Sequence, residues 1–371
     1  MIRHTKVILV WTLICVCFFT LGCQNKSKTS VPKAVKVKAE KSLLGNDLAE
    51  EKKMLSEYGF FKSPIAELAP SEGVFPYDIN NPLFSDYALK KRFVFLPSEK
   101  KMKIEDTDEI AFEEGSILIK NFYYPADYND TKSRVRNIET RLLIKDKQGW
   151  KPLNYIWNED QTDAELNFIG DTQTVQFTDD NNTTRSFTYQ IPNLNECKNC
   201  HLKGKDITPI GPTIAQLSKK YSFSEEQLNQ LETFQNWSLI DLPGHPSILP
   251  KQPVWNDSKV SLEERAKAYL DANCAHCHNP KGSAKNSGLY LSYTEKDARK
   301  RGVFKPPVAA GKGSGDFEYS IVPGHPETSI LIYRMKSTDP AIQMPEIGRS
   351  LVHQEGVALL EDYIRTLTVE D

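Results

Sequence analysis

Short apolar stretches rich in aromatic and β-branched residues dominate the chain from about residue 73 to 192. They read KRFVFLP, SILIKNFYYP, IETRLLIKD, WKPLNYIW, TVQFTDD and RSFTYQIP, and the turn signals KDKQGW and DDNNTT lie between them. Runs of this length, bounded by Gly, Asn and Asp, are typical of strands that pair through hairpins. This part is predicted to form an antiparallel β domain, as a sandwich or a barrel.

The pattern changes to a helical period in the second half of the chain. Two helices are expected in DITPIGPTIAQLSKKY and SFSEEQLNQLETFQNW, where Ser224 and Gln227 form a capping box. SLEERAKAYLDANC begins with a capping box of Ser261 and Glu264, and LVHQEGVALLEDYIRTL near the end also has helical spacing. The predicted fold class is therefore α+β, with an N-terminal antiparallel β domain followed by an all-α domain.

The first residues have the layout of an export signal. Arg3, His4 and Lys6 precede an almost wholly apolar run over 7–21, which is short for a membrane span of about 20 residues. The following Gly-Cys pair resembles the lipobox of bacterial lipoproteins, although Thr20 stands where Leu is usual. We expect a signal peptide over 1–22 and a lipid on Cys23 that anchors the chain to a membrane; a plain signal peptide is the alternative.

The segment after Cys23 is rich in Lys, Ser and Val and carries no aromatic residue up to Glu40. It cannot bury enough apolar surface to fold, so a flexible tether is expected over 23–57. A Pro-rich stretch over 243–253 indicates the next boundary. The predicted domains are thus 58–250, β-rich with its covering helices, and 251–371.

Composition excludes some partners. The chain has 371 residues and a formal net charge of -2, with 39% hydrophobic residues. This is an ordinary globular composition without the basic surplus that binding to nucleic acid requires.

The cysteines are distributed unusually. Of seven, Cys15 and Cys17 lie in the signal and Cys23 is the expected lipid site. The other four form two Cys-x-x-Cys-His pentads, CKNCH and CAHCH, with the residues Cys197, Cys200, His201, Cys274, Cys277 and His278. This is the attachment signature of haem c: two thiols bond to the two vinyl groups and the adjacent His ligates iron. Two covalently bound haem c groups are predicted, haem 1 in 58–250 and haem 2 in 251–371.

Three other uses of the cysteines fit the sequence less well. A thioredoxin-like pair needs a βαβ context and no following His. A zinc site made of both pairs usually spans a gap of about 15–20 residues, much shorter than the gap between the pentads. Two local disulfides would leave both histidines without a role.

Axial iron ligands follow from the pentads and from methionines. His201 and His278 are the expected proximal ligands, and Met344, in a loop restrained by the following Pro, is the expected second ligand of haem 2. Met335 and Met102 are expected to be core side chains. The sequence does not identify the second ligand of haem 1; His245 and an exchangeable position are two of the candidates.

Several other polar residues are given structural roles. His325 is expected in a turn and His276 on the surface. Four acidic residues cluster in WNEDQTDAEL, namely Glu159, Asp160, Asp163 and Glu165. Their spacing differs from that of an EF-hand, so a solvated acidic loop is expected rather than a calcium site.

The C-terminal motifs CAHCHNP, SGLYL (287–291), PGHPETSILIYRM (323–335) and MPEIG (344–348) resemble class I cytochrome c domains of the planctomycete type. With NPLFSDYALKKRFVFLP (81–97) and YIWNEDQTDAEL (155–166), the chain from about residue 58 resembles a family of exported dihaem c-type cytochromes. The resemblance implies haem and a class I cytochrome c-like domain over 251–371, but no substrate.

The sequence favours a lipid-anchored dihaem cytochrome that transfers electrons in the bacterial cell envelope, on the periplasmic side or the cell surface, with a redox partner it does not identify. It favours an electron-transfer protein over a catalyst. The alternative is a haem-dependent oxidoreductase, peroxidase-like or other, with haem 1 as its catalytic centre. A third hypothesis is a binding module whose β domain recognises a glycan or a protein partner.

Overall fold

A computed structural model describes residues 51–105, 108–223, 226–308 and 310–368. All of these belong to one compact unit. The predicted signal peptide, the lipid site at Cys23 and the tether as far as residue 50 lie outside the described residues. No helix within the described ranges is long and apolar enough to cross a membrane.

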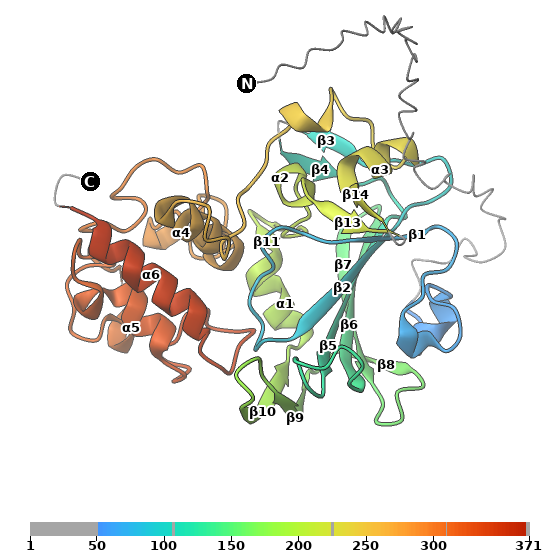
Figure 1. Ribbon diagram of the computed structural model, residues 1–371, viewed down its shortest axis with the longest axis horizontal. Coiled ribbons are helices and arrows are strands. Elements are labelled where there is room, and N and C mark those ends of the chain that lie inside the picture. The colour runs from blue at the N-terminus through green and yellow to red at the C-terminus, as the bar shows by residue number, and fades with distance from the viewer. Residues whose placement is uncertain (1–50, 106–107, 224–225, 309, 369–371) are drawn as a thin grey trace, which may run out of the picture. The chain divides into compact units, whose positions relative to one another are not determined.

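A six-stranded antiparallel sheet forms the centre of the N-terminal part (Figure 1). Its strands, in spatial order, are β1 (Val74–Tyr77), β2 (Leu89–Phe95), β5 (Ile117–Pro125), β6 (Val135–Asp146), β7 (Gly149–Trp157) and β8 (Ala164–Asn167). The KDKQGW turn joins β6 to β7, as predicted, and pairs Asp146 with Gly149.

Four two-stranded hairpins accompany the sheet. They are β3 (Lys103–Glu105) with β4 (Glu109–Ala111), β9 (Asp171–Thr178) with β10 (Thr184–Ile191), β11 (Leu202–Lys203) with β12 (Asp206–Ile207), and β13 (Lys220–Ser222) with β14 (Gln227–Asn229). The six predicted strands and the DDNNTT hairpin are confirmed, because β9 and β10 pair on either side of that turn.

Six short α-helices occur among the described residues. They are α1 (Leu194–His201), α2 (Ile214–Leu217), α3 (Gln230–Asn236), α4 (Leu262–Leu270), α5 (Ile330–Lys336) and α6 (Gln354–Thr366). A π-helical turn continues α4 over Asp271–Ala275, and 3₁₀ turns occupy Leu55–Tyr58, Ile65–Glu67, Pro246–Ile248, Lys285–Ser287, Gly311–Ser314 and Pro326–Thr328. The Ser261 hydroxyl accepts a hydrogen bond from Glu264 N at 3.3 Å, so this half of the predicted capping box is confirmed. The Glu264 carboxylate accepts from the Tyr293 hydroxyl rather than from Ser261 N.

The predicted fold class is wrong, because the described residues are mostly β and do not form an all-α class I cytochrome c domain. In the C-terminal part, α4, α5 and α6 pack on a common core but have only 9, 7 and 13 residues. Turns and 3₁₀ segments occupy most of the chain between them. The physical cause is the frequency of helix-ending residues there, namely Gly302, Pro306, Pro307, Gly311, Gly313, Gly315, Pro323, Gly324, Pro326, Pro340 and Pro345.

The two helices predicted after the first pentad are also much shorter than expected. In the first segment only Ile214–Leu217 is helical, because Pro209, Gly211 and Pro212 precede it. In the second, Gln227–Asn229 is a strand, and α3 begins after Asn229, whose side chain accepts from Glu232 N. The predicted Ser224 cap lies outside the described residues.

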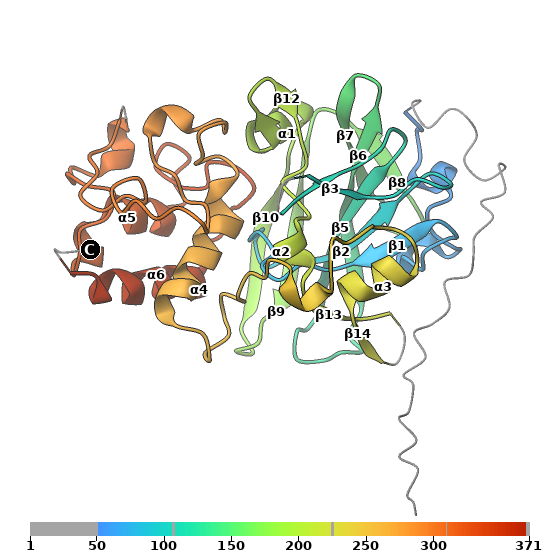
Figure 2. The same cartoon turned by 90° about the horizontal axis from the view of Figure 1, so that it is seen from above.

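Each face of the sheet packs against different elements (Figure 2). On one face, Phe93, Ile119 and Tyr155 pack with N-terminal residues such as Tyr58 and Phe60. On the other face there are two apolar clusters. One joins β2 and β5 to α2 and α3, and the other joins β5 and β6 to the β9–β10 hairpin. The strip of sheet between these two clusters is polar, and it is described below.

The loop over 81–88 joins the sheet to the C-terminal part. Phe84 N donates to the Asn273 side chain at 2.8 Å, and the Phe84 ring stacks on His353 with centroids 4.2 Å apart. The buried carboxylate of Asp86 accepts from Ser350 N and Leu351 N, both at 2.7 Å. The NPLFSDYALKKRFVFLP motif therefore has a structural role at this joint.

Burial raises the pKa of Asp86 from 3.8 to about 6, despite the backbone N–H groups that lower it. The unfolded chain therefore releases the Asp86 proton at a lower pH than the folded chain does. The free energy of unfolding should fall by about 2–3 kcal/mol as pH rises from 4 to 6, and Asp86→Asn should remove this contribution. Denaturant titrations at intervals across that range, with exposed Asp362→Asn as control, measure it; equal slopes in wild type and Asp86→Asn would contradict it.

Candidate functional site

The two pentads meet in space, although 78 positions separate Asn199 from Cys277. Ligand atoms of Cys200, His276 and Cys277 all lie within 4.8 Å of one another, and Cys277 Sγ lies 3.7 Å from Asn199 O. Backbone pairing continues beside them, where Gly204 N donates to Lys281 O at 2.9 Å. The sequence assigned the pentads to separate domains and did not predict this contact.

The first pentad is the second half of helix α1. Asn193 caps the helix by accepting from Asn195 N and Glu196 N, while Glu196 accepts from Asn193 N. Because residues three and four apart share one side of a helix, Cys197, Cys200 and His201 project to the same side. The local fold thus places two thiols and an imidazole together, as attachment of one haem requires.

His201 is held in one orientation by a backbone carbonyl. Its Nδ1 lies 2.9 Å from Thr208 O, and the β11–β12 hairpin supplies this contact by folding back on the pentad. Burial lowers the pKa of His201 to about 4, so the ring is neutral at physiological pH. With Nδ1–H donating to the carbonyl, Nε2 is the nitrogen that presents a lone pair, as in protein metal sites.

The second pentad follows α4 through the π-helical turn. Cys277 N and His278 N both donate to Cys274 O, at 3.2 and 2.9 Å. His278 Nδ1 lies 3.3 Å from Ser287 Oγ, and burial lowers the pKa of His278. Gly282 approaches closely, because a Cβ there would lie 2.2 Å from Cys277 O. His278 thus repeats the arrangement of His201, with Ser287 in place of a carbonyl.

The four pentad cysteines are free thiols in unequal environments. Burial raises the pKa of Cys197 and raises that of Cys274 to about 12. A hydrogen bond between the Cys200 and Cys277 side chains raises the pKa of Cys200 and lowers that of Cys277. Cys277 is therefore the thiol with the most thiolate character, and the thiolate is the reactive form.

These residues fit haem c. Each pentad offers two reduced thiols and a neutral imidazole whose Nδ1 has a partner, which is the donor set for two thioether bonds and one axial bond to iron. Cys197, Cys200 and His201 would hold haem 1, and Cys274, Cys277 and His278 would hold haem 2.

The predicted methionines occupy different environments. Met335 and Met102 are buried in apolar clusters, so their expected core roles are confirmed. Met344 is half-buried, and its N–H donates to Arg334 O at 3.1 Å. Buried Arg349 donates to Met344 O at 3.0 Å and to Ser337 O at 2.8 Å, which fixes the loop that carries Met344. Its role as an iron ligand stays a prediction.

The remaining histidines differ in their outcome. His245 is exposed and caps a 3₁₀ turn by accepting from Ser247 N at 3.3 Å. His325 lies in the expected turn, beside Glu327 at 3.0 Å. The surface position expected for His276 is wrong: the residue is half-buried, and its buried Nδ1 has no hydrogen-bond partner among the described residues. The cause is the neighbouring first pentad.

The acidic cluster is a structural loop. Asp163 accepts from Ser56 N at 3.1 Å and from the Ser56 hydroxyl at 2.5 Å, which joins the loop to the N-terminal segment. Asn158 Oδ1 accepts from Thr162 N at 2.9 Å within the turn. Glu159 and Asp160 are exposed. The expected solvated loop is confirmed.

The sequence did not reveal a group of cations on the polar strip of the sheet, beside the first pentad. Lys90 and Arg92 from β2, Lys120 from β5 and Arg141 from β6, here called the cationic cluster, share one face. Lys120 and Arg141 lie over the Phe122 ring, with centroid distances of 4.8 and 4.4 Å. Burial, with Arg92 and Arg141 nearby, lowers the pKa of Lys120 to about 7. The sequence carries one signal for this cluster, because cations alternate with other residues in LKKRF and ILIKNF. Which cations lie opposite one another depends on strand register, which the sequence does not show.

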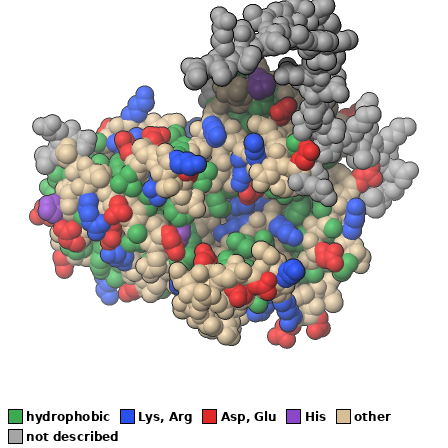
Figure 3. All heavy atoms as spheres, in the orientation of Figure 1, with side chains coloured by type: hydrophobic (Ala, Val, Ile, Leu, Met, Phe, Trp, Pro, Cys, Tyr) green, Lys and Arg blue, Asp and Glu red, His purple; other side chains and the backbone are tan. Residues whose placement is uncertain are grey.

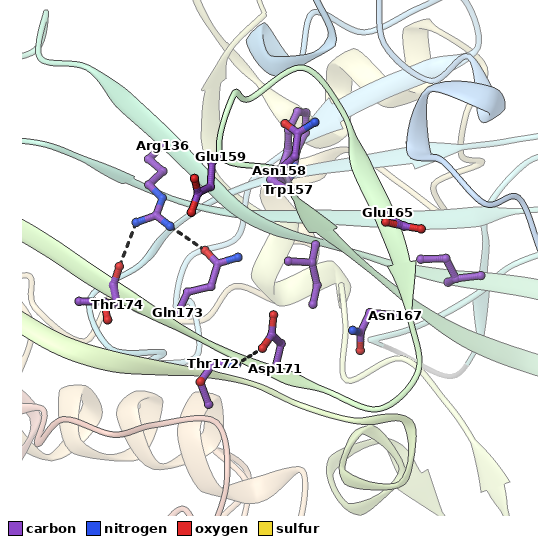
Figure 4. A pocket seen from close by; sticks show the side chains of 12 residues that line it. Arg136, Trp157, Asn158, Glu159, Glu165, Asn167, Asp171, Thr172, Gln173 and Thr174 are labelled. Atoms are coloured by element: carbon purple, nitrogen blue, oxygen red, sulfur yellow. Dashed lines mark hydrogen bonds between the residues drawn. The ribbon is translucent and has the colours of Figure 1, made fainter.

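A hollow of about 730 Å³ lies between β7, β8 and β9, and no pentad residue lines it (Figure 4). Arg136 lies on one side of it and donates to Thr174 O at 2.9 Å and to the Gln173 side chain at 3.0 Å. The guanidinium of Arg136 is therefore already hydrogen-bonded to acceptors of the protein itself.

Comparisons with family models, with curated proteins and with solved structures found no match for this chain.

The unequal thiols lead to a prediction for the chain produced without haem. Cys200→Ala removes the hydrogen bond that favours the Cys277 thiolate, so the pKa of Cys277 should rise. Alkylation by iodoacetamide, followed by mass spectrometry of the peptide that contains Cys277, should require a higher pH than in wild type. Cys197→Ala, on the same helix, is the control and should leave the pH profile in place. An unchanged profile in Cys200→Ala would contradict the pairing of the two thiols.

Proposed function

We propose that this protein is an exported dihaem c-type cytochrome that transfers electrons between two adjacent covalently attached haems. The observation that supports this best is the contact between the pentads, with Cys200 and Cys277 side chains within 4.8 Å. Two isolated attachment signatures would suit independent carriers. Two haems attached through neighbouring sulfur atoms would exchange electrons rapidly, because the rate of electron transfer falls steeply with distance.

Bound haem supplies one-electron chemistry between ferric and ferrous iron. The chain's own residues bind and orient it: the cysteines fix each porphyrin edge, and Thr208 and Ser287 set the orientation of His201 and His278. The joint between loop 81–88 and the C-terminal part keeps the two pentads in contact. The proposal includes export and a lipid anchor at Cys23, which rest on the sequence pattern alone.

One observation favours a second candidate. Cys200, His276 and Cys277 present two sulfurs and a nitrogen within 4.8 Å of one another, and such soft ligands suit zinc or copper(I). The spacing in sequence had argued against a site shared by both pentads, but the fold brings them together. This alternative needs free thiols, whereas haem attachment consumes them, so the two candidates exclude each other in one molecule.

Haem content tests the proposed function directly. The mature protein should carry two haems, measured by intact mass and by haem stain after denaturation. Cys197→Ala with Cys200→Ala should leave one haem, and Cys274→Ala with Cys277→Ala should also leave one. Alkylation of the mature wild type should find no free pentad thiol.

His276→Ala is a matched control, because His276 lies inside the second pentad but supplies neither a thioether nor an axial ligand in this proposal. It should leave two haems. A mature protein that contains stoichiometric zinc or copper, no haem and alkylatable pentad thiols would overturn the proposal in favour of the soft-metal site.

The second prediction concerns Met344. If Met344 ligates haem 2, Met344→Ala should open that iron to CO and lower its reduction potential, because a His/Met pair raises the potential. Met335→Leu is the control and should leave the haem spectrum in place, since Met335 is a buried core residue. If Met344→Ala leaves both spectrum and potential unchanged, Met344 is not the ligand. CO binding by the wild-type protein would instead favour the oxidoreductase alternative.

A further inference from the structure

Three residues of the cationic cluster form a row across the sheet, and Lys90 lies beside it, opposite Phe122. Register places Arg92 opposite Lys120, Lys120 opposite Arg141, and Arg141 opposite Asn154. Side chains opposite one another on neighbouring strands lie on the same face with Cβ atoms about 4.5–5.5 Å apart, and like charges in such pairs repel. Three cations in consecutive positions are therefore unfavourable unless an anion lies among them.

The protein supplies only part of the negative charge. Asp78 pairs with Arg92 at 3.1 Å and also with Lys219, and Glu139 pairs with Arg141. Asp86, the remaining carboxylate near Lys90, accepts from the backbone of the C-terminal part.

Lys90 and Lys120 have no carboxylate within ion-pair distance among the described residues. Lys90 Nζ donates to Leu83 O at 3.0 Å, and Lys120 Nζ lies over the Phe122 ring. Both ammonium groups are half-buried. The sheet face thus carries two lysine amino groups that none of its own acids pairs with. Burial and the neighbouring cations lower the pKa of both, and an anion beside them would raise it again.

Asn154, at the end of the row, is a second and independent sign of a ligand. Its side chain is 5% exposed, and neither its amide oxygen nor its amide nitrogen has a hydrogen-bond partner among the described residues. A buried amide without hydrogen-bond partners lowers the stability of the fold, so native proteins usually provide a partner for it. The Asn154 NH₂ group and the Arg141 guanidinium can both donate to one anion.

The row lies where such an anion would meet the first pentad. The row ends at Asn154 on β7, and both α1, which carries the first pentad, and β12 contact β7. Lys and Arg side chains gather in the middle of the face seen in Figure 3, over the strands of the sheet. Apolar clusters flank the strip on both sides, which limits solvent screening of the charges.

We propose that Lys90, Arg92, Lys120, Arg141 and Asn154 form a binding site for a carboxylate anion beside the first pentad. A carboxylate suits the ammonium groups of the two lysines and the N–H groups of Arg141 that its pair with Glu139 leaves unused. The carboxylate has two sources: a propionate of haem 1, which rests on the proposed function, or a free di- or tricarboxylate, which does not.

The test uses the purified full-length protein, whose haem content is measured first. Variants are Lys120→Met, which removes a charge that has no ion-pair partner; Lys120→Arg, which keeps it; and Lys91→Met, the control on the opposite face of β2. Two measurements are made on each: calorimetric titration with citrate, and the pH dependence of the haem midpoint potentials.

If a propionate occupies the site, citrate does not bind to wild type. A redox-linked ionisation then moves up by at least one pH unit in Lys120→Met, because the lost cation had stabilised the propionate anion, and it stays in place in Lys120→Arg and Lys91→Met. If the site takes a free anion, citrate binds to wild type, Lys120→Arg and Lys91→Met, and at least tenfold more weakly to Lys120→Met.

Absence of citrate binding together with an unchanged ionisation in Lys120→Met would overturn the site. A protein that carries no haem but binds citrate in a Lys120-dependent way would overturn the proposed function and leave the anion site standing. The two failures are therefore distinguishable in one set of samples.

Discussion

Cys200 and Cys277 belong to different pentads, far apart in the sequence, and their sulfur atoms approach within 4.8 Å. This contact constrains the elements around it. Helix α1 must lie beside the sheet, the π-helical turn after α4 must face it, and Gly282 must allow the chain to pass close to Cys277 O. The two pentads therefore form one site, and both the proposed electron exchange and the alternative soft-metal site follow from that proximity.

The contact depends on polar interactions away from it. Buried Asp86 is the principal example, because a carboxylate removed from water is stable only while its hydrogen bonds to Ser350 N and Leu351 N are intact. Phe84 and His353 add a stacked aromatic pair to the same joint. The joint and the backbone contact between Gly204 and Lys281 thus both link the N-terminal part to the C-terminal part.

Local features were predictable from the sequence, and long-range ones were not. The six predicted strands, the hairpin turns KDKQGW and DDNNTT and the cap at Ser261 follow from alternation and turn chemistry over a few residues, whereas the other short hairpins were not predicted. The prediction of an all-α C-terminal domain was wrong. It relied on the helical spacing of apolar residues, which takes no account of the Pro and Gly residues that end helices between 302 and 345. The buried position of His276 and the row from Arg92 to Asn154 depend on strand register and on which segments meet, and no local pattern encodes either.

The proposed function requires two haems that are attached through adjacent sulfur atoms and interact electronically. Circular dichroism of the oxidised holoprotein in the haem absorption region tests it most directly, because two nearby chromophores couple and give a band that changes sign. Wild type should show such a band. Both single-haem forms should lack it: the double variant Cys197→Ala with Cys200→Ala, and the double variant Cys274→Ala with Cys277→Ala. A wild-type spectrum equal to the sum of the two single-haem spectra would contradict it.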